Sequence, residues 1–152
     1  DPNKKDPGVP GIEPAPIRSA GIVGAGIMGQ GIAAANVKRR IPVALTDARP
    51  EALAAGVQGV LEEVSYNKQT KSADVNRTLE FAPLVNGTTL DSELCATDIV
   101  IEAIIEDPAA KRQLFERIEP QLGPNAILCS NTSTIPITTL AADLQDPARF
   151  CG

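Results

Sequence analysis

Short apolar runs alternate with longer segments of helical spacing along most of the chain. The apolar runs predict strands at residues 19–23, 43–46, 81–85, 98–104, 126–130 and 149–152. The segments between them predict helices at residues 28–39, 50–69, 73–79, 108–118 and 135–144. Regular alternation of this kind is typical of an α/β fold with a doubly wound, mostly parallel sheet that carries helices on both faces.

Several local signals support these boundaries. Pro50 and Pro108 fit the first position of a helix, where the missing N–H is not needed. The run DIVIEAI within 98–104 is apolar enough for a strand buried on both faces. Asn86-Gly87 predicts a turn, although the pattern is weakest in this part of the chain, between residues 71 and 90.

The ends of the chain differ from its centre. Residues 1–17 are crowded with prolines and charges, which predicts an extended linker or tail, and residues 18–152 predict one folded domain. The chain starts at Asp1 and stops just after the start of an expected strand, so we expect it to be a piece of a longer protein.

Composition narrows the class of protein. Of the 152 residues, 43% are hydrophobic and 22% are charged, as in soluble globular proteins, and the net charge of −5 argues against a nucleic-acid surface. No apolar stretch is long enough to span a membrane, and we expect a cytoplasmic protein without a metal site. Its three cysteines form no CxxC pair, and we expect them to be reduced and buried.

The segment Gly24-Ala25-Gly26-Ile27-Met28-Gly29 follows an expected strand and opens an expected helix, the context of a dinucleotide-binding loop. Gly24 permits a tight turn, Gly26 lets a pyrophosphate approach the backbone, and Gly29 lets the helix pack on the strand. The free N–H groups at the start of the helix favour negative charge. These features predict a Rossmann-type domain.

Asp47 stands at the end of the second expected strand, where a carboxylate can accept hydrogen bonds from the ribose hydroxyls of adenosine. The 2′-phosphate of NADP would be repelled by this carboxylate, so the position predicts NAD, although Arg49 would offset part of the repulsion. Asp47 is also compatible with a simpler role as the N-cap of the next helix.

Four runs in order resemble the NAD-binding domain of the 3-hydroxyacyl-CoA dehydrogenases. They are GIVGAGIMGQGIA, IEAIIED, AKRQLFERIE and ILCSNTSTIPIT, at residues 21–33, 101–107, 110–119 and 127–138. Together the match covers about residues 19–152. Within the family, the Pro-rich start and the IPV sequence before the second strand most resemble the alpha subunit of the bacterial fatty acid oxidation complex. Arg40 stands where such proteins often carry a glycine, a departure that concerns the local turn.

The resemblance implies a role for each candidate residue. Ile27, Met28 and Asp47 contact NAD, while Glu106 and Lys111 lie near its nicotinamide half. Ser133 lies near the nicotinamide and the hydroxyl of the substrate. The residues alone leave other roles open: a charge at the start of a helix for Glu106, a solvated face for Lys111 and a helix N-cap for Ser133.

Oxidation of a secondary alcohol by NAD also requires a base for the hydroxyl proton, and this chain contains no histidine. The family's base is a histidine in a stretch that would begin just past Gly152. We therefore expect the chain to bind NAD without turnover. The resemblance further implies that the parent protein oxidises 3-hydroxyacyl-CoA to 3-ketoacyl-CoA in β-oxidation, with a C-terminal helical domain, as a homo-oligomer or within a multienzyme complex.

Two other functions remain open at this point. The first is a 3-hydroxy acid dehydrogenase of the 6-phosphogluconate dehydrogenase type, which begins with a similar glycine run. The second is a Rossmann module that binds NAD without catalysing a reaction, since a fold by itself fixes no chemistry.

Overall fold

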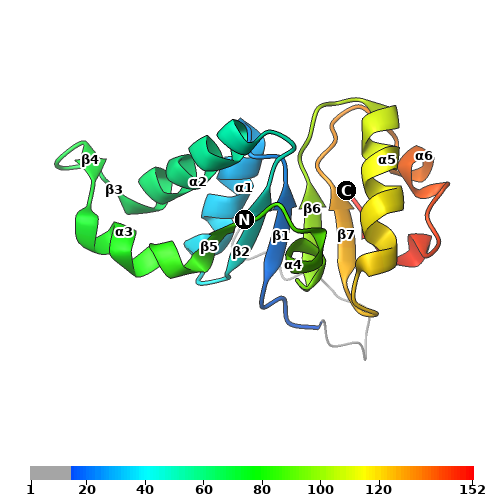
Figure 1. Cartoon of the computed structure of the whole chain (residues 1–152), viewed down its shortest axis with the longest axis horizontal. Helices are drawn as coiled ribbons and strands as arrows, with labels where there is room; N and C mark the ends of the chain where they lie inside the picture. The colour runs from blue at the N-terminus through cyan, green and yellow to red at the C-terminus, as the bar shows by residue number, and fades with distance from the viewer. Residues whose placement is uncertain (1–14) are drawn as a thin grey trace, which may run out of the picture.

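A six-stranded parallel sheet forms the centre of the molecule in the computed structural model, which describes residues 15–152 (Figure 1). The strand order is β5-β2-β1-β6-β7-β8, and every pairing in this sheet is parallel. The expected doubly wound α/β fold is confirmed. The strands are β1 (Ala20–Val23), β2 (Val43–Thr46), β5 (Val85–Gly87), β6 (Ile99–Glu102), β7 (Ile127–Ser130) and β8 (Phe150–Cys151).

Helices cover both faces of the sheet, and the sheet separates two apolar cores. They are α1 (Ile27–Val37), α2 (Pro50–Ser65), α3 (Val75–Phe81), α4 (Asp91–Cys95), α5 (Pro108–Ile118) and α6 (Ile137–Ala141), with 3₁₀ turns at Ala82–Leu84, Glu119–Gln121 and Pro147–Arg149. Residues of α1, α2 and α3 pack in one core, and residues of α4, α5 and α6 pack in the other. Successive strand residues point to opposite faces, so Ile22 enters the first core and Val23 the second.

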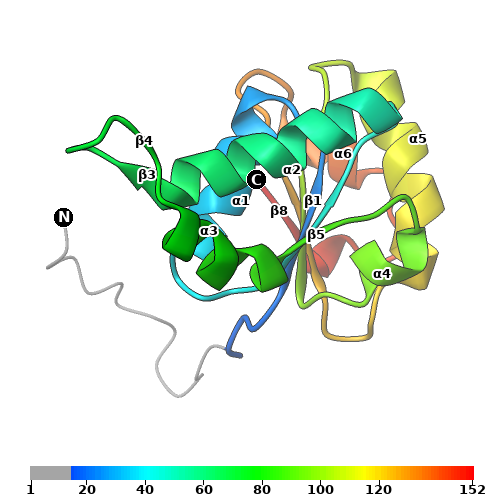
Figure 2. The same cartoon turned by 60° about the vertical axis from the view of Figure 1, so that its left-hand side comes forward.

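The segment after α2 differs from its prediction. The helix expected to reach residue 69 ends at Ser65, and an antiparallel hairpin follows, made of β3 (Tyr66–Asn67) and β4 (Ser72–Ala73). Figures 1 and 2 show this hairpin extending away from the main sheet, beyond the end of α2. A two-residue strand leaves too few alternating positions for a sequence pattern to detect.

The strand expected at residues 81–85 is wrong. Phe81 ends α3, residues 82–84 form a 3₁₀ turn, and Pro83 within that turn has no N–H to offer a strand ladder. The strand begins instead at Val85 and takes in Asn86-Gly87, which was expected to turn. Parallel pairing with β2 therefore overrides the local turn signal. The short helix α4 was not predicted.

The cysteines only partly match their prediction. All three are free, but only Cys95 is buried, whereas Cys129 is half-buried and Cys151 is exposed. Cys129 and Cys151 face each other across β7 and the edge strand β8, with their sulfur atoms 2.8 Å apart. The proline-rich stretch expected at 1–17 lies mostly outside the described residues, and its role as a linker stays a prediction.

Candidate functional site

The glycine loop connects the end of β1 to the start of α1. Gly24 has a φ of 104°, a left-handed conformation that suits glycine, and a Cβ on Gly29 would lie 1.7 Å from the carbonyl oxygen of Gly24. Both positions therefore need glycine for the loop to close against the helix. Gly26 is the N-cap of α1 and offers no side chain to the first N–H groups of the helix. These donors are available to an anion.

The space in front of the loop is open. A Cβ added to Gly26 would meet no atom within 4 Å, so the glycine is not required by packing inside this chain. Ile27 and Met28, the next two residues, are 90% and 58% exposed. Large apolar side chains at this exposure are consistent with a surface that a bound molecule covers.

Asp47 follows β2 and holds the glycine loop. Its carboxylate accepts a hydrogen bond from the N–H of Ala25 at 2.9 Å and another from the N–H of Arg49 at 3.0 Å. The N-cap of α2 is Arg49, so the alternative role of Asp47 as a helix cap is wrong. Asp47 instead lies beside the loop, half-buried, with its carboxylate next to the first glycines.

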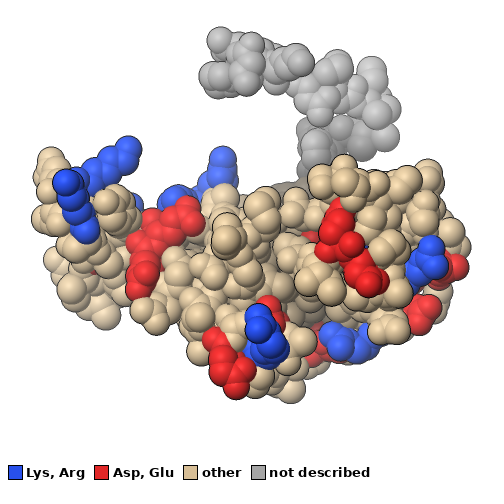
Figure 3. Space-filling model, turned by 90° about the horizontal axis from the view of Figure 1, so that it is seen from above, with Lys and Arg blue, Asp and Glu red and all other residues tan. Residues whose placement is uncertain are grey.

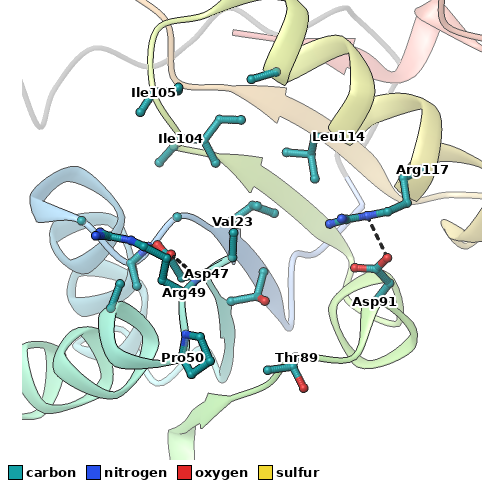
Figure 4. A pocket seen from close by; sticks show the side chains of 18 of the residues that line it. Val23, Asp47, Arg49, Pro50, Thr89, Asp91, Ile104, Ile105, Leu114 and Arg117 are labelled. Atoms are coloured by element: carbon teal, nitrogen blue, oxygen red, sulfur yellow. Dashed lines mark hydrogen bonds and ion pairs between the residues drawn. The ribbon is translucent and has the colours of Figure 1, made fainter.

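A cavity of about 910 Å³ lies between these elements. Gly24, Gly26 and Asp47 line it together, and Ile104 and Leu114 line the other side, as Figure 4 shows for the labelled side chains. The cavity lies at the carboxyl ends of β1 and β6, where the connections leave the sheet in opposite directions. This is the place where doubly wound folds bind ligands, and its size suits a drug-sized or nucleotide-sized molecule.

The far end of the cavity is polar. Arg117 of α5 and Asp91 of α4 both line it and form an ion pair with 3.0 Å between Nε and Oδ2, drawn as a dashed line in Figure 4. The sequence patterns did not single out either residue. The pair joins α4 and α5, two helices of the second core.

A second group of polar residues gathers around Glu106, which follows β6. One oxygen of its carboxylate accepts hydrogen bonds from the hydroxyls of Thr132 and Thr134 and from the N–H groups of Ser133 and Thr134. The Thr132 hydroxyl foremost, then the hydroxyl and N–H of Thr134 and the ammonium of Lys111, lower the pKa of Glu106 to about 2. The carboxylate thus binds the loop after β7, and the cap of α5 is the neighbouring Asp107.

Ser133 lies exposed on this loop. Its N–H donates to Glu106 at 3.2 Å. The N-cap of α6 is Pro136, with no side-chain cap, so the alternative role of Ser133 as a helix cap is wrong. The chain folds this loop around Glu106 and leaves the serine side chain toward solvent.

Lys111 is fully buried, so the alternative prediction of a solvated face is wrong. Its ammonium lies 2.6 Å and 2.8 Å from the two carboxylate oxygens of Glu102, which is also fully buried, and 3.3 Å from Glu106. The structure therefore places Lys111 behind Glu106, away from the surface of the cavity.

Not all site residues predicted from the sequence line the cavity, since Ile27, Met28 and Gly29 follow the lining glycines at the start of α1. Gly24, Gly26 and Asp47 line the cavity, whereas Glu106 and Ser133 meet beside it and Lys111 lies beneath them. Sequence reasoning missed Glu102. A signal was present, because a carboxylate inside the apolar run DIVIEAI must have a partner when that strand is buried.

Figure 3 shows the molecule from above in the orientation of Figure 1, the side toward which β1, β6 and β7 point. Charged side chains of both signs form small separate groups on this face, and most of the visible surface carries no charge. Among the residues that the structure describes, no helix is both long enough and apolar enough to cross a membrane.

Comparison with known proteins places the chain among dehydrogenases. Residues 19–152 match the family model described as 3-hydroxyacyl-CoA dehydrogenase, NAD binding domain. The fatty acid oxidation complex subunit alpha of Idiomarina loihiensis is 35% identical over 136 residues, which are 90% of this chain and 19% of that protein. The chain therefore spans about a fifth of the length of this curated relative.

Solved structures agree with the family model. The (S)-3-hydroxybutyryl-CoA dehydrogenase of Ralstonia eutropha is 36% identical with a TM-score of 0.80, over 89% of this chain and 48% of that one. The 3-hydroxybutyryl-CoA dehydrogenase of Escherichia coli is 28% identical with a TM-score of 0.80, over 90% of this chain and 29% of that one. The lactate dehydrogenase of Eimeria maxima, 17% identical with a TM-score of 0.63 over 93% of this chain and 44% of that one, shares only the Rossmann-like fold. The chain belongs to the 3-hydroxyacyl-CoA dehydrogenase family and corresponds to its NAD-binding domain.

Proposed function

We propose that this chain binds NAD in the cavity at the carboxyl ends of β1 and β6, with its pyrophosphate at the glycine loop. The observation that carries the proposal is the meeting of Gly24, Gly26 and Asp47 at one cavity, with open space where a Cβ of Gly26 would stand. Free N–H groups at the start of α1 suit a phosphate, and the carboxylate of Asp47 suits the ribose hydroxyls of adenosine.

The nicotinamide half extends toward the loop after β7. Ile27 and Met28 cover the cofactor from the start of α1, and Glu106 with Ser133 forms the polar side of the nicotinamide site. Bound NAD supplies the acceptor for a hydride from the substrate. The hydroxyl of Ser133 orients the alcohol of that substrate, since a serine is a poor base near neutral pH.

In the parent protein we place this domain in the reversible oxidation of 3-hydroxyacyl-CoA to 3-ketoacyl-CoA, during fatty acid β-oxidation in the cytoplasm. This chain contains no histidine, so the general base has to come from another part of the parent. The purified chain should therefore give no steady NADH production with a 3-hydroxyacyl-CoA. A steady, substrate-dependent rise in the absorbance of NADH would contradict the proposal that the general base lies outside this chain.

The choice of cofactor is tested by titrating the chain and an Asp47→Asn variant with NAD and NADP in a calorimeter. Asparagine keeps an acceptor for the N–H of Ala25 and removes the charge. We expect the chain to prefer NAD, and the variant to lose about tenfold of that preference because the 2′-phosphate no longer meets a carboxylate. Tighter binding of NADP by the unaltered chain would overturn the cofactor assignment.

A further inference from the structure

Two carboxylates and one ammonium form a buried arrangement beneath the loop that carries Ser133. The ammonium of Lys111 has three donors, and three oxygens surround it: two from Glu102 at 2.6 Å and 2.8 Å and one from Glu106 at 3.3 Å. The ammonium therefore donates to both oxygens of Glu102 and lies within ion-pair distance of Glu106. Lys111 and Glu102 have no exposed side-chain surface, and Glu106 retains 36%.

Glu102 holds the near end of the same loop. It accepts a hydrogen bond from the hydroxyl of Ser130 at 2.5 Å and another from the N–H of Ile104 at 2.7 Å. Ser130 is the last residue of β7, and the loop begins directly after it. The far part of the loop, from Thr132 to Thr134, is bound by Glu106. One ammonium thus joins the two carboxylates that fix both ends of the loop.

The buried ion pair of Lys111 and Glu102 is poorly explained by a contribution to the stability of the fold. The cost of removing two charges from water often exceeds their attraction, and apolar residues of similar volume frequently stabilise a fold as well or better. A buried pair that also touches a partly exposed carboxylate has another use, because it fixes where that carboxylate points. The direction of Glu106 in turn decides where the N–H groups of Ser133 and Thr134 lie.

We propose that Lys111 and Glu102 are positioning residues: the ammonium of Lys111, held by Glu102, fixes Glu106 and through it the loop that presents Ser133. This inference rests on the proposed function of Ser133 and Glu106 beside the nicotinamide. It also gives Lys111 an indirect role, since its position behind Glu106 keeps it from contacting the cofactor itself.

The test uses a Glu102→Gln/Lys111→Met double variant, which removes both buried charges at similar volume. A Lys38→Met/Glu63→Gln variant is the matched control, since that ion pair is also 2.8 Å long but exposed. Amide hydrogen exchange is measured at Ser133 and Thr134 without NAD, and compared with exchange in β1. We expect exchange at the two loop amides to rise about tenfold in the double variant, with β1 and the control unchanged.

Glu106→Gln is the second variant, because it alters a partly exposed side chain and leaves the buried pair in place. It should raise exchange at the same two amides, and adding it to the double variant should add little, since both changes act through one contact. The proposal is overturned if the double variant folds and its amide exchange at Ser133 and Thr134 equals that of the unaltered chain. If the double variant does not fold, unchanged loop exchange in Glu106→Gln overturns it and raised exchange supports it.

NAD titration of the same proteins tests the proposed NAD site separately from the positioning role of Lys111 and Glu102. Weaker binding in Glu106→Gln and in the double variant, with no additivity when the changes are combined, supports an indirect role for Lys111. Additive losses would instead show that Lys111 contacts the cofactor directly. Failure of the unaltered chain to bind NAD would contradict the proposed function, while the exchange result would still decide whether the buried pair positions the loop.

Discussion

Asp47 and Lys111 show how far single residues can be interpreted from the sequence. The position of Asp47 after the second strand predicts a carboxylate for the ribose of adenosine, and the structure places this carboxylate at the glycine loop because parallel strands end at a common edge. The buried position of Lys111 could not be predicted in the same way. Its partner Glu102 lies nine residues earlier on a strand, and only the packing of α5 on β6 brings the two together.

Glu106 should make the stability of the chain depend on pH in acid. Its pKa falls from the usual 4.5 to about 2 on folding, so its contribution is complete above 4.5 and is lost as the pH falls toward 2. Urea unfolding of the chain and of Glu106→Gln should therefore differ at neutral pH. That difference should shrink between pH 4.5 and 2. An equal difference at both ends of this range would contradict the bonding described for the carboxylate.

The elements that formed as predicted are those with strong local patterns. The strands β1, β2, β6 and β7 are short apolar runs, and α5 has both a proline at its start and a capping aspartate, Asp107. The strands of the hairpin and α4 are too short to show a period, and β5 depends on its pairing with the distant strand β2. No pattern of a few residues could indicate where they begin.

The turn between α1 and β2 contains Arg40, a residue other than glycine with a positive φ. Arg40 has a φ of 64°, a conformation that favours glycine, and its guanidinium lies 4.9 Å from the ring centroid of Phe81 and pairs with Glu80. The side-chain contacts therefore offset backbone strain at this turn.

Arg40→Ala and Arg40→Gly separate these two effects. Both lose the contacts with Phe81 and Glu80, but only alanine keeps a Cβ in the left-handed conformation. We expect Arg40→Gly to be more stable than Arg40→Ala by about 0.5–1 kcal/mol, the strain removed being larger than the entropy that glycine adds to the unfolded chain. Urea unfolding measures the difference. An alanine variant as stable as the glycine variant would exclude strain at this turn.

On the scale of the whole molecule, four adjacent parallel strands bring the candidate residues to one edge. The glycine loop follows β1, Asp47 follows β2, Glu106 follows β6 and the Ser133 loop follows β7. Motifs spread over more than a hundred residues thus converge because parallel strands share their carboxyl edge. The match covers 48% of the Ralstonia eutropha relative, and in the proposed function the catalytic base belongs to the remainder of the parent.

Binding of NAD at the glycine loop is tested by calorimetric titration of three proteins with NAD: the chain, Gly26→Ala and Gly31→Ala. A Cβ at either glycine meets no atom within 4 Å, so both variants should fold, but only Gly26 lies where we propose that the pyrophosphate binds. We predict equal NAD affinity for the chain and Gly31→Ala, and a loss of at least about tenfold for Gly26→Ala. Equal affinity in all three, or no saturable binding by the chain, would contradict the account.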